Sequence, residues 1–444
     1  MKLLKRILLL LFIVLAVIVY LNYPKLNIIS GYAAKNMASA VFVAERTAAS
    51  VTQNDNNVPL IKLADTEVDQ QQKTAAASVY GLMNREALYR EGLGTVLVTD
   101  DYEANKIQIK PNRIQPSDTI PYPYGQQAPL DTIFPEIDQD QLNKAIALAF
   151  GDPEVQKTRT LLVLYKGHLI AEKYADGFTK DTPILGWSMT KSVLATCYGV
   201  LEQEGKLEME WPAPIAEWGD DERKEITLNH LLRMQSGLEW DEDYTKISDV
   251  TKMLFLESDM TMSQRNKPAV APPVEIWNYS SGTSNLLSGI LRQQFRSHQE
   301  YLDFPYKSFI DKIGMYSMVL EADVAGNYVG SSYSWASTRD WARFGQLYLD
   351  RGLWNGEQLF KDSWVDYITT PTAGSDGWYG AHFWLNSQGK YPDVPRDLFS
   401  CNGYQGQYVF VIPSKELVVV RTGLAEDPEF NINEILSAVV KSIP

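Results

Sequence analysis

The sequence predicts an α+β fold whose main domain has antiparallel hairpins near both ends and helices between them. Residues 160–174 and 408–421 each contain two apolar runs separated by a short turn, which is the pattern of a β-hairpin. Residues 191–205 instead carry apolar side chains at helical spacing and close on a glycine, as a helix does. Hairpins at both ends with helices between them are typical of an α+β domain.

The individual elements of this domain can be placed in chain order. Lys166-Gly167-His168 and Pro413-Ser414-Lys415 supply the turns of the two hairpins. The predicted elements are a helix at 139–150, strands at 160–165 and 169–174, a helix that begins near Ser188, strands at 408–412 and 417–421, and a last helix from about Asn431.

Composition and charge limit the class of protein. At 444 residues, with 45% apolar and 22% charged residues, the chain resembles an ordinary globular protein with ample core. Its net charge of −14 argues against nucleic acid as a partner, because a polyphosphate would be repelled. Two cysteines give no disulfide framework, and a buried, free Cys197 is the favoured interpretation. The four histidines have no metal-ligand spacing, so neither a metal nor a cofactor is expected.

Ser188-Met189-Thr190-Lys191 is the most informative segment of the chain. Residues three apart on a helix lie on one face, so the Lys191 amine can reach the Ser188 hydroxyl. At the first turn of a helix, unpaired N–H groups and the helix dipole stabilise negative charge, as an alkoxide or oxyanion requires. A second S-x-x-K string at 387–390 contains a glycine and precedes Pro392, so it predicts a loop. Ser188 and Lys191 are therefore candidates for acyl transfer without a histidine.

Two later segments carry the other candidate residues. Trp277-Asn278-Tyr279-Ser280-Ser281-Gly282 brings a tyrosine and a second hydroxyl together in a polar turn. Cys401-Asn402-Gly403-Tyr404-Gln405-Gly406-Gln407 precedes an apolar strand. Each residue also has a structural interpretation: a packed aromatic ring, a turn-forming hydroxyl or a glycine at the start of a strand. Cys401 is either a reactive thiol or, as cysteines more often are, a small buried side chain.

In this order the three segments resemble the motifs of the serine β-lactamase and penicillin-binding-protein superfamily. The resemblance is to its class C β-lactamase, esterase and 6-aminohexanoate-dimer hydrolase branch, whose motifs run S-x-x-K, Y-x-N, then K-T-G or H-x-G. Residues 226–238 and 330–345 are similar to two further segments of that family. The resemblance covers residues 135–444 and implies a β-lactamase/transpeptidase-like fold. Such a fold has an antiparallel sheet flanked by helices and a mostly helical subdomain, with the site at their junction.

The resemblance also implies a reaction, namely cleavage of an amide or ester bond through a Ser188 acyl-enzyme. Lys191 would take the serine proton, because desolvation in a closed cleft lowers the pKa of a lysine. Tyr279 would be the second proton carrier. Backbone N–H groups of Ser188 and Tyr404 would form the oxyanion hole, with Gly403 allowing close approach of the backbone.

Two departures from the family pattern bear on the substrate. Ser281 stands where class C β-lactamases have asparagine, and it is more similar to the 6-aminohexanoate-dimer hydrolase type. Cys401 stands where a lysine or histidine is usual, which argues against ordinary β-lactam turnover. Trp187 and Trp277 flank two motifs, and are either aromatic walls of the cleft or core anchors.

Several functions remain open at this point. A small amide, ester or peptide-like substrate is expected, and D-Ala carboxypeptidase and β-lactamase activities are alternatives. A second class of function is a non-catalytic, membrane-tethered binding or sensor protein on the same fold, since the third motif lacks its cation. The oligomeric state is also open.

The N-terminus predicts export. Lys2, Lys5 and Arg6 precede an uncharged apolar run at 7–21, which is typical of a secretion signal. No A-x-A cleavage site follows closely, so residues 1–25 are expected to be an uncleaved membrane anchor in preference to a removed signal sequence. The basic end would then face the cytoplasm of a bacterium, and the hydrolase would lie in the periplasm or outside the cell.

The rest of the chain divides into two parts. Residues 26–134 are expected to form an extension and linker, with a strand at 94–98 and a linker or extended strap at 116–125. Residues 135–444 are expected to form the hydrolase domain.

Overall fold

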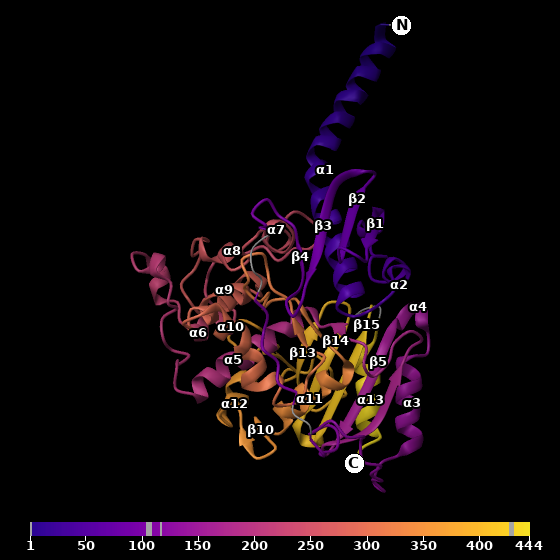
Figure 1. Cartoon of the computed structure of the whole chain (residues 1–444), viewed down its shortest axis with the longest axis vertical. Coiled ribbons are helices and arrows are strands. Elements are labelled where there is room, and N and C mark those ends of the chain that lie inside the picture. The colour runs from indigo at the N-terminus through magenta and orange to yellow at the C-terminus, as the bar shows by residue number, and fades with distance from the viewer. Residues whose placement is uncertain (1, 104–108, 116–117, 426–429) are drawn as a thin grey trace.

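The computed structural model describes residues 2–103, 109–115, 118–425 and 430–444 (Figure 1). Its main sheet has six antiparallel strands in the order β12-β13-β14-β15-β5-β6. Because β15 pairs with β5, the two hairpins predicted from the sequence meet in one sheet. The strands are β5 (Thr158–Tyr165), β6 (His168–Tyr174), β12 (Trp384–Leu385), β13 (Phe399–Gly403), β14 (Gln407–Ile412) and β15 (Leu417–Gly423).

Helices cover both faces of the main sheet. The helices α3 (Gln139–Ala149) and α13 (Ile432–Lys441) pack on one face, and α11 (Thr338–Leu349) packs on the other. Side chains alternate along β5, so Leu161 and Val163 join the core of the first face while Leu162 and Leu164 join the core of the second. A strand buried on both faces is a nearly continuous apolar run, which is why this hairpin can be predicted from the sequence.

The region between β6 and β13 is mostly helical. Its central helix α5 (Thr190–Gln203) is buried from Thr190 to Leu201. The α+β class, with an antiparallel sheet flanked by helices, is thereby confirmed. The other helices of this region are α6 (Leu228–Leu232), α7 (Asp249–Leu256), α8 (Met262–Arg265), α9 (Ser281–Arg292), α10 (His298–Pro305) and α12 (Ser363–Thr369), beside α11.

One short helix and two small sheets also belong to the hydrolase region. The three-stranded sheet has the order β7-β9-β8, and β10 pairs with β11. The bounds are β7 (Ile184–Leu185), β8 (Val319–Leu320), β9 (Ser334–Ala336), β10 (Leu353–Trp354), β11 (Glu357–Gln358) and α4 (Pro153–Gln156).

The N-terminal extension consists of a long helix and its own sheet (Figure 1). The helix α1 (Lys2–Phe42) and α2 (Ala48–Gln53) precede four antiparallel strands, β1 (Ala64–Asp69), β2 (Thr74–Val79), β3 (Leu82–Arg90) and β4 (Gly94–Leu97). Alanines such as Ala33, Ala75 and Ala87 are fully buried between α1 and this sheet, and their small side chains bring helix and strands close together. The strand expected at 94–98 is confirmed as β4, whereas the polar β1, the alanine-rich β2 and β3 were not predicted.

The first half of α1 projects from the body of the molecule (Figure 1). Large apolar side chains there are exposed; for example, Leu3 is 72% exposed and Val19 is 54% exposed. Over the residues described, no helix meets both the length and the apolarity needed to cross a membrane. The helix continues through Pro24 and past residue 25 without a break.

The strap expected at 116–125 is described from residue 118, since residues 116 and 117 lie outside the described residues. The buried Tyr122 donates a hydrogen bond from its hydroxyl to the Arg339 carbonyl oxygen at 3.0 Å. The Arg343 guanidinium donates to the Gly125 carbonyl oxygen at 2.8 Å. These contacts hold the strap on α11.

Candidate active site

Ser188 lies in a tight turn at the start of α5. Residues Trp187–Met189 form one turn of 3₁₀-helix, and Trp187 has a φ of 48°, in the left-handed region. The Gly186 N–H donates to the Ser334 carbonyl oxygen at 2.7 Å, which fixes this turn against β9. The turn therefore presents the Ser188 hydroxyl at the N-terminus of the buried helix, as the sequence predicts.

Lys191 is buried beside Ser188, with 1% of its surface exposed. Its Nζ lies 3.1 Å from Ser188 Oγ, 3.1 Å from Ser281 Oγ and 2.9 Å from the Ser331 carbonyl oxygen. Desolvation lowers the pKa of Lys191 to about 8, and the charge of Glu242 opposes this change in part. A substantial fraction of this amine is thus uncharged just above neutral pH.

Tyr279 completes the group around the serine. Its phenol hydrogen-bonds to Ser188, and Lys191 Nζ lies 4.9 Å from the centre of its ring. Burial raises the pKa of the Tyr279 phenol, and the hydrogen bond with Ser188 offsets only part of this effect. The phenol therefore keeps its proton at neutral pH, whereas part of the Lys191 amine is uncharged just above it.

Ser281 connects Lys191 to an acidic residue that sequence analysis missed. Ser281 is the first residue of α9 and is fully buried, and its hydroxyl donates to Glu242 Oε1 at 2.5 Å. The Ser281 N–H also donates to Glu242 Oε2 at 2.9 Å, and the Tyr244 hydroxyl donates to Glu242 Oε1 at 2.9 Å. Ser281 thus lies between Lys191 and Glu242 rather than on the surface of the cleft.

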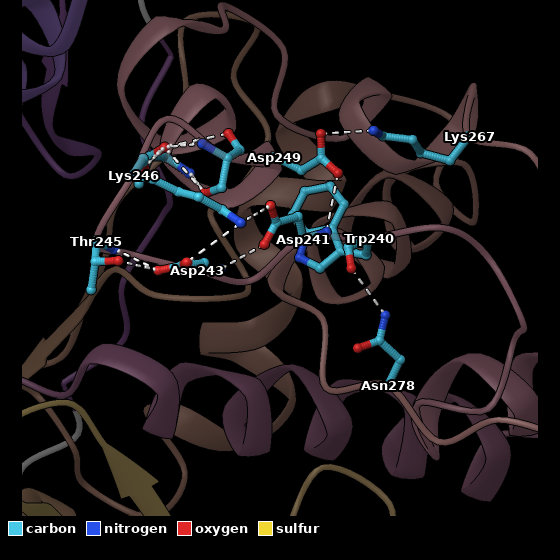
Figure 2. A network of polar contacts seen from close by, with 10 residues as sticks. Trp240, Asp241, Asp243, Thr245, Lys246, Asp249, Lys267 and Asn278 are labelled. Carbon is cyan, nitrogen blue, oxygen red and sulfur yellow. Dashed lines mark hydrogen bonds and ion pairs between the residues drawn. The ribbon is translucent and has the colours of Figure 1, made fainter. Parts of the chain in front are cut away.

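Glu242 and Tyr244 belong to a loop that polar contacts hold in place (Figure 2). Lys246 forms ion pairs with Asp241 and Asp243, with N···O distances of 3.0 and 3.5 Å. The Asn278 side chain donates to the Trp240 carbonyl oxygen at 3.2 Å, which joins this loop to the segment that carries Tyr279. Figure 2 also shows the ion pair of Lys267 with Asp249, 2.7 Å long, where the loop enters α7.

The third motif packs directly against the turn that carries Ser188. A Cβ added to Gly403 would lie 2.1 Å from the Gly186 carbonyl oxygen, so only glycine allows β13 to approach this closely. The ring of Tyr404 meets the ring of Trp187 edge-on, with centroids 5.8 Å apart. The structure therefore places Gly403 and Tyr404 beside the turn that carries Ser188.

Cys401 is buried rather than exposed to substrate. It is 2% exposed and belongs to the core beneath β13, while Asn402 lines the cleft. Desolvation raises the pKa of Cys401 to about 12. Cys197 is also buried, and both cysteines are free. The small buried side chain is thus the correct interpretation of Cys401.

His382 has a structural role. His382 is buried, its Nδ1 lies 2.7 Å from the Leu232 carbonyl oxygen, and its Nε2 lies 3.0 Å from Ser284 Oγ. Burial lowers the pKa of His382 to about 3, so it remains neutral. Within the described ranges, no group of three or more His, Cys, Asp or Glu residues could hold a metal ion.

Comparison with known proteins assigns the chain to a family. The Beta-lactamase family model matches residues 155–430, more than half of the 444 residues. The chain belongs to the beta-lactamase family. It is therefore a member of the serine hydrolase superfamily, and the β-lactamase/transpeptidase-like fold expected from the resemblance is confirmed.

Individual relatives agree with this assignment. A 6-aminohexanoate-dimer hydrolase of Paenarthrobacter ureafaciens is 22% identical over 321 residues, which cover 64% of this chain and 78% of that protein. A solved structure assigned as a 6-aminohexanoate-dimer hydrolase of Bacillus anthracis has a TM-score of 0.55 and 21% identity, and covers 65% of this chain and 79% of its own. A family VIII carboxylesterase structure has a TM-score of 0.50 and 14% identity, and covers 71% of this chain and all 100% of its own. The two structures show a shared fold.

A large cleft opens at Ser188 in this beta-lactamase-family protein. Its volume is about 790 Å³, within the range of roughly 300–1,000 Å³ for ligand pockets. Of the two roles left open for these tryptophans, Trp187 takes that of a cleft wall, whereas Trp277 does not line the cleft and packs on the buried Tyr379 ring, with centroids 5.5 Å apart. Trp384, which sequence analysis did not single out, also lines the cleft, and its ring centroid lies 5.5 Å from that of Tyr279.

Proposed function

We propose that this beta-lactamase-family protein hydrolyses an amide or ester bond through an acyl-enzyme on Ser188. The observation that supports this most strongly is the position of Lys191 Nζ, 3.1 Å from Ser188 Oγ, in a buried setting that lowers its pKa to about 8. A general base works best when its pKa lies near the working pH, and an ordinary lysine does not meet that condition.

In the acylation step, the neutral Lys191 amine takes the Ser188 proton while Ser188 Oγ bonds to the substrate carbonyl carbon. The carbonyl oxygen gains negative charge in the resulting tetrahedral intermediate. Backbone N–H groups of Ser188 and Tyr404 are proposed to stabilise that charge, because donors fixed in advance need no rearrangement during the reaction. The close approach of Gly403 to Gly186 supports this assignment, since it brings the two backbone segments together.

Tyr279 is proposed to supply the proton that the leaving group needs. As the carbon–nitrogen or carbon–oxygen bond breaks, the phenol protonates the departing atom, and the proton held on Lys191 replaces the one that Tyr279 has lost. Water then attacks the acyl-enzyme, with the same groups moving protons in the reverse sense. The neutral phenol and its hydrogen bond with Ser188 support this role.

A substrate panel read by mass tests the proposal. Wild type, Ser188→Ala and Lys191→Ala are incubated with amides, esters, D-alanyl peptides and a penicillin. We expect the wild type to cleave an amide or an ester, and both variants to lose that activity. Cleavage of D-alanyl peptides or of the penicillin alone would instead indicate a D-Ala carboxypeptidase or a β-lactamase. No turnover and no covalent labelling of the wild type would favour the binding or sensor protein.

We further infer that the protein is exported and associates with a membrane through residues 1–25. The basic residues Lys2, Lys5 and Arg6 and the exposed apolar side chains that follow them support this location. Fractionation of cells that express the full chain, with protease added to intact spheroplasts, tests it. Recovery of the protein in the soluble cytoplasmic fraction, protected from protease, would contradict it.

A further inference from the structure

Two segments of the N-terminal extension form one side of the cleft at Ser188. The first is the face of α1 that carries Ile28, Ile29 and Tyr32, and the second is the chain from Val58 to Ile61. Both lie outside residues 155–430, which the family model matches. This side of the cleft is therefore supplied by a part of the chain that is additional to the family domain. We call these residues the apolar wall.

The apolar wall begins at the nucleophile. The Tyr32 ring stacks on Trp187, the residue next to Ser188, with centroids 6.0 Å apart. It also contacts the Phe255 ring of α7, with centroids 5.7 Å apart, and Phe255 lines the same cleft. Leu60 lies on the wall and is 52% exposed, so part of its apolar surface is available to a ligand. A chain bound to Ser188 could thus lie against these apolar side chains.

Buried polar contacts fix the apolar wall to the hydrolase domain. Lys35 Nζ forms an ion pair with Glu321, 2.6 Å long, and both side chains are at most 8% exposed. The Asn36 side chain donates to Asn56 Oδ1 at 2.9 Å, and the Asn56 side chain donates to the Ala33 carbonyl oxygen at 3.2 Å. The first contact holds α1 on the domain, and the other two tie the 58–61 segment to α1. These contacts therefore hold the apolar wall in a fixed position beside the cleft.

We propose that the substrate carries an extended apolar acyl or alkyl chain, which lies along this wall while its carbonyl group meets Ser188. The proposal rests on the hydrolase function proposed above and names the class of substrate. A cleft of about 790 Å³ has room for such a chain in addition to the scissile group. Each methylene transferred from water to apolar surface changes a binding equilibrium by about fourfold, so chain length should be visible in kcat/KM.

The test is a series of p-nitrophenyl esters from acetyl to octanoyl, measured as monomers with wild type, Ser188→Ala, Leu60→Asn and Leu63→Asn. Asparagine has the branched outline of leucine but carries a polar amide, so it removes apolar surface from position 60 without a large change of shape. Leu63 is the matched control, because it is 38% exposed, lies in the same short helical turn as Ile61 and does not line the cleft. Melting temperatures verify that the variants are folded.

We expect kcat/KM of the wild type to rise by at least about tenfold from acetyl to octanoyl. Leu60→Asn should reduce this octanoyl-to-acetyl ratio several-fold, and Leu63→Asn should leave it as in wild type. A wild-type ratio near one, or the same ratio in both leucine variants, would overturn the proposed substrate class while leaving the hydrolase function intact. Failure of the hydrolase function itself is distinct, because no ester would then be turned over in a Ser188-dependent manner.

Discussion

The pH dependence of Ser188 acylation follows from the burial of Lys191. Only the uncharged amine can accept the serine proton, and the pKa of Lys191 is lowered from 10.5 to about 8 by desolvation. With that pKa, about one-tenth of the lysine is neutral at pH 7 and about nine-tenths at pH 9. The acylation rate should therefore rise about tenfold over this interval and then level off. An unperturbed lysine would give a rise of about a hundredfold that continues beyond pH 10.

The assay is the rate of covalent labelling of Ser188 by a fluorophosphonate between pH 6 and 10, followed by intact-protein mass. Lys191→Arg keeps the positive charge but cannot lose its proton, so labelling should slow by about 10²–10⁴-fold at every pH. Lys252→Ala, which removes an exposed lysine from α7, serves as the control and should keep the wild-type profile. A flat wild-type profile, or a rise without a plateau up to pH 10, would refute this account of the base.

Three further predictions concern the surroundings of the catalytic group. The charge of Glu242 raises the pKa of Lys191, so Glu242→Gln should move the midpoint of the labelling profile to lower pH. An unchanged or higher midpoint would show that Glu242 does not act on the lysine. Gly403→Ala should slow labelling more than tenfold and cost about 1–3 kcal/mol of unfolding free energy, because its Cβ would lie 2.1 Å from a backbone oxygen. The control is Gly151→Ala, whose Cβ would meet nothing closer than 3.5 Å. Equal melting temperatures and labelling rates for Gly403→Ala and Gly151→Ala would contradict the close packing of Gly403 on Gly186. Cys401, with its pKa raised to about 12, should resist iodoacetamide at pH 8 in the native protein and react only after denaturation, whereas rapid native labelling would show that it is accessible.

The parts of the site that depend on local geometry could be predicted from the sequence. Ser188 and Lys191 are three residues apart at a helix start, so the helix itself brings them together. Four strands of the main sheet, β5, β6, β14 and β15, could be predicted for a similar reason, because they are apolar runs that turns interrupt, whereas β12 and β13 were not predicted. That these hairpins meet as β15 and β5 is a long-range pairing that local pattern does not specify.

Glu242 and Tyr244 could not be predicted because nothing local distinguishes them from a solvated acidic loop. Their place beside Ser281 depends on contacts between segments distant in the chain, such as the donation from the Ser281 N–H to Glu242. Trp277 and Trp384 illustrate the same point, since both are aromatic residues near the motifs and only packing decides which one faces the cleft.

The position of α1 at the cleft also could not be predicted from the sequence. Its apolar first half predicts a membrane anchor at residues 1–25. The helix continues to Phe42, and its second half packs through small residues on a sheet. The first strand of this sheet is polar and the second is rich in alanine, which is uncommon in strands, so neither could be recognised. The apolar wall results from this packing, and no sequence motif marks it.

The most direct test of the proposed mechanism is to locate the covalent intermediate. Wild type and Ser188→Ala are quenched in acid during turnover of a slowly hydrolysed ester, digested, and mapped by tandem mass spectrometry. We predict an acyl group on Ser188 in the wild type that disappears as the ester is exhausted, and no adduct in Ser188→Ala. An acyl group on any other residue, or steady turnover by Ser188→Ala, would contradict the account.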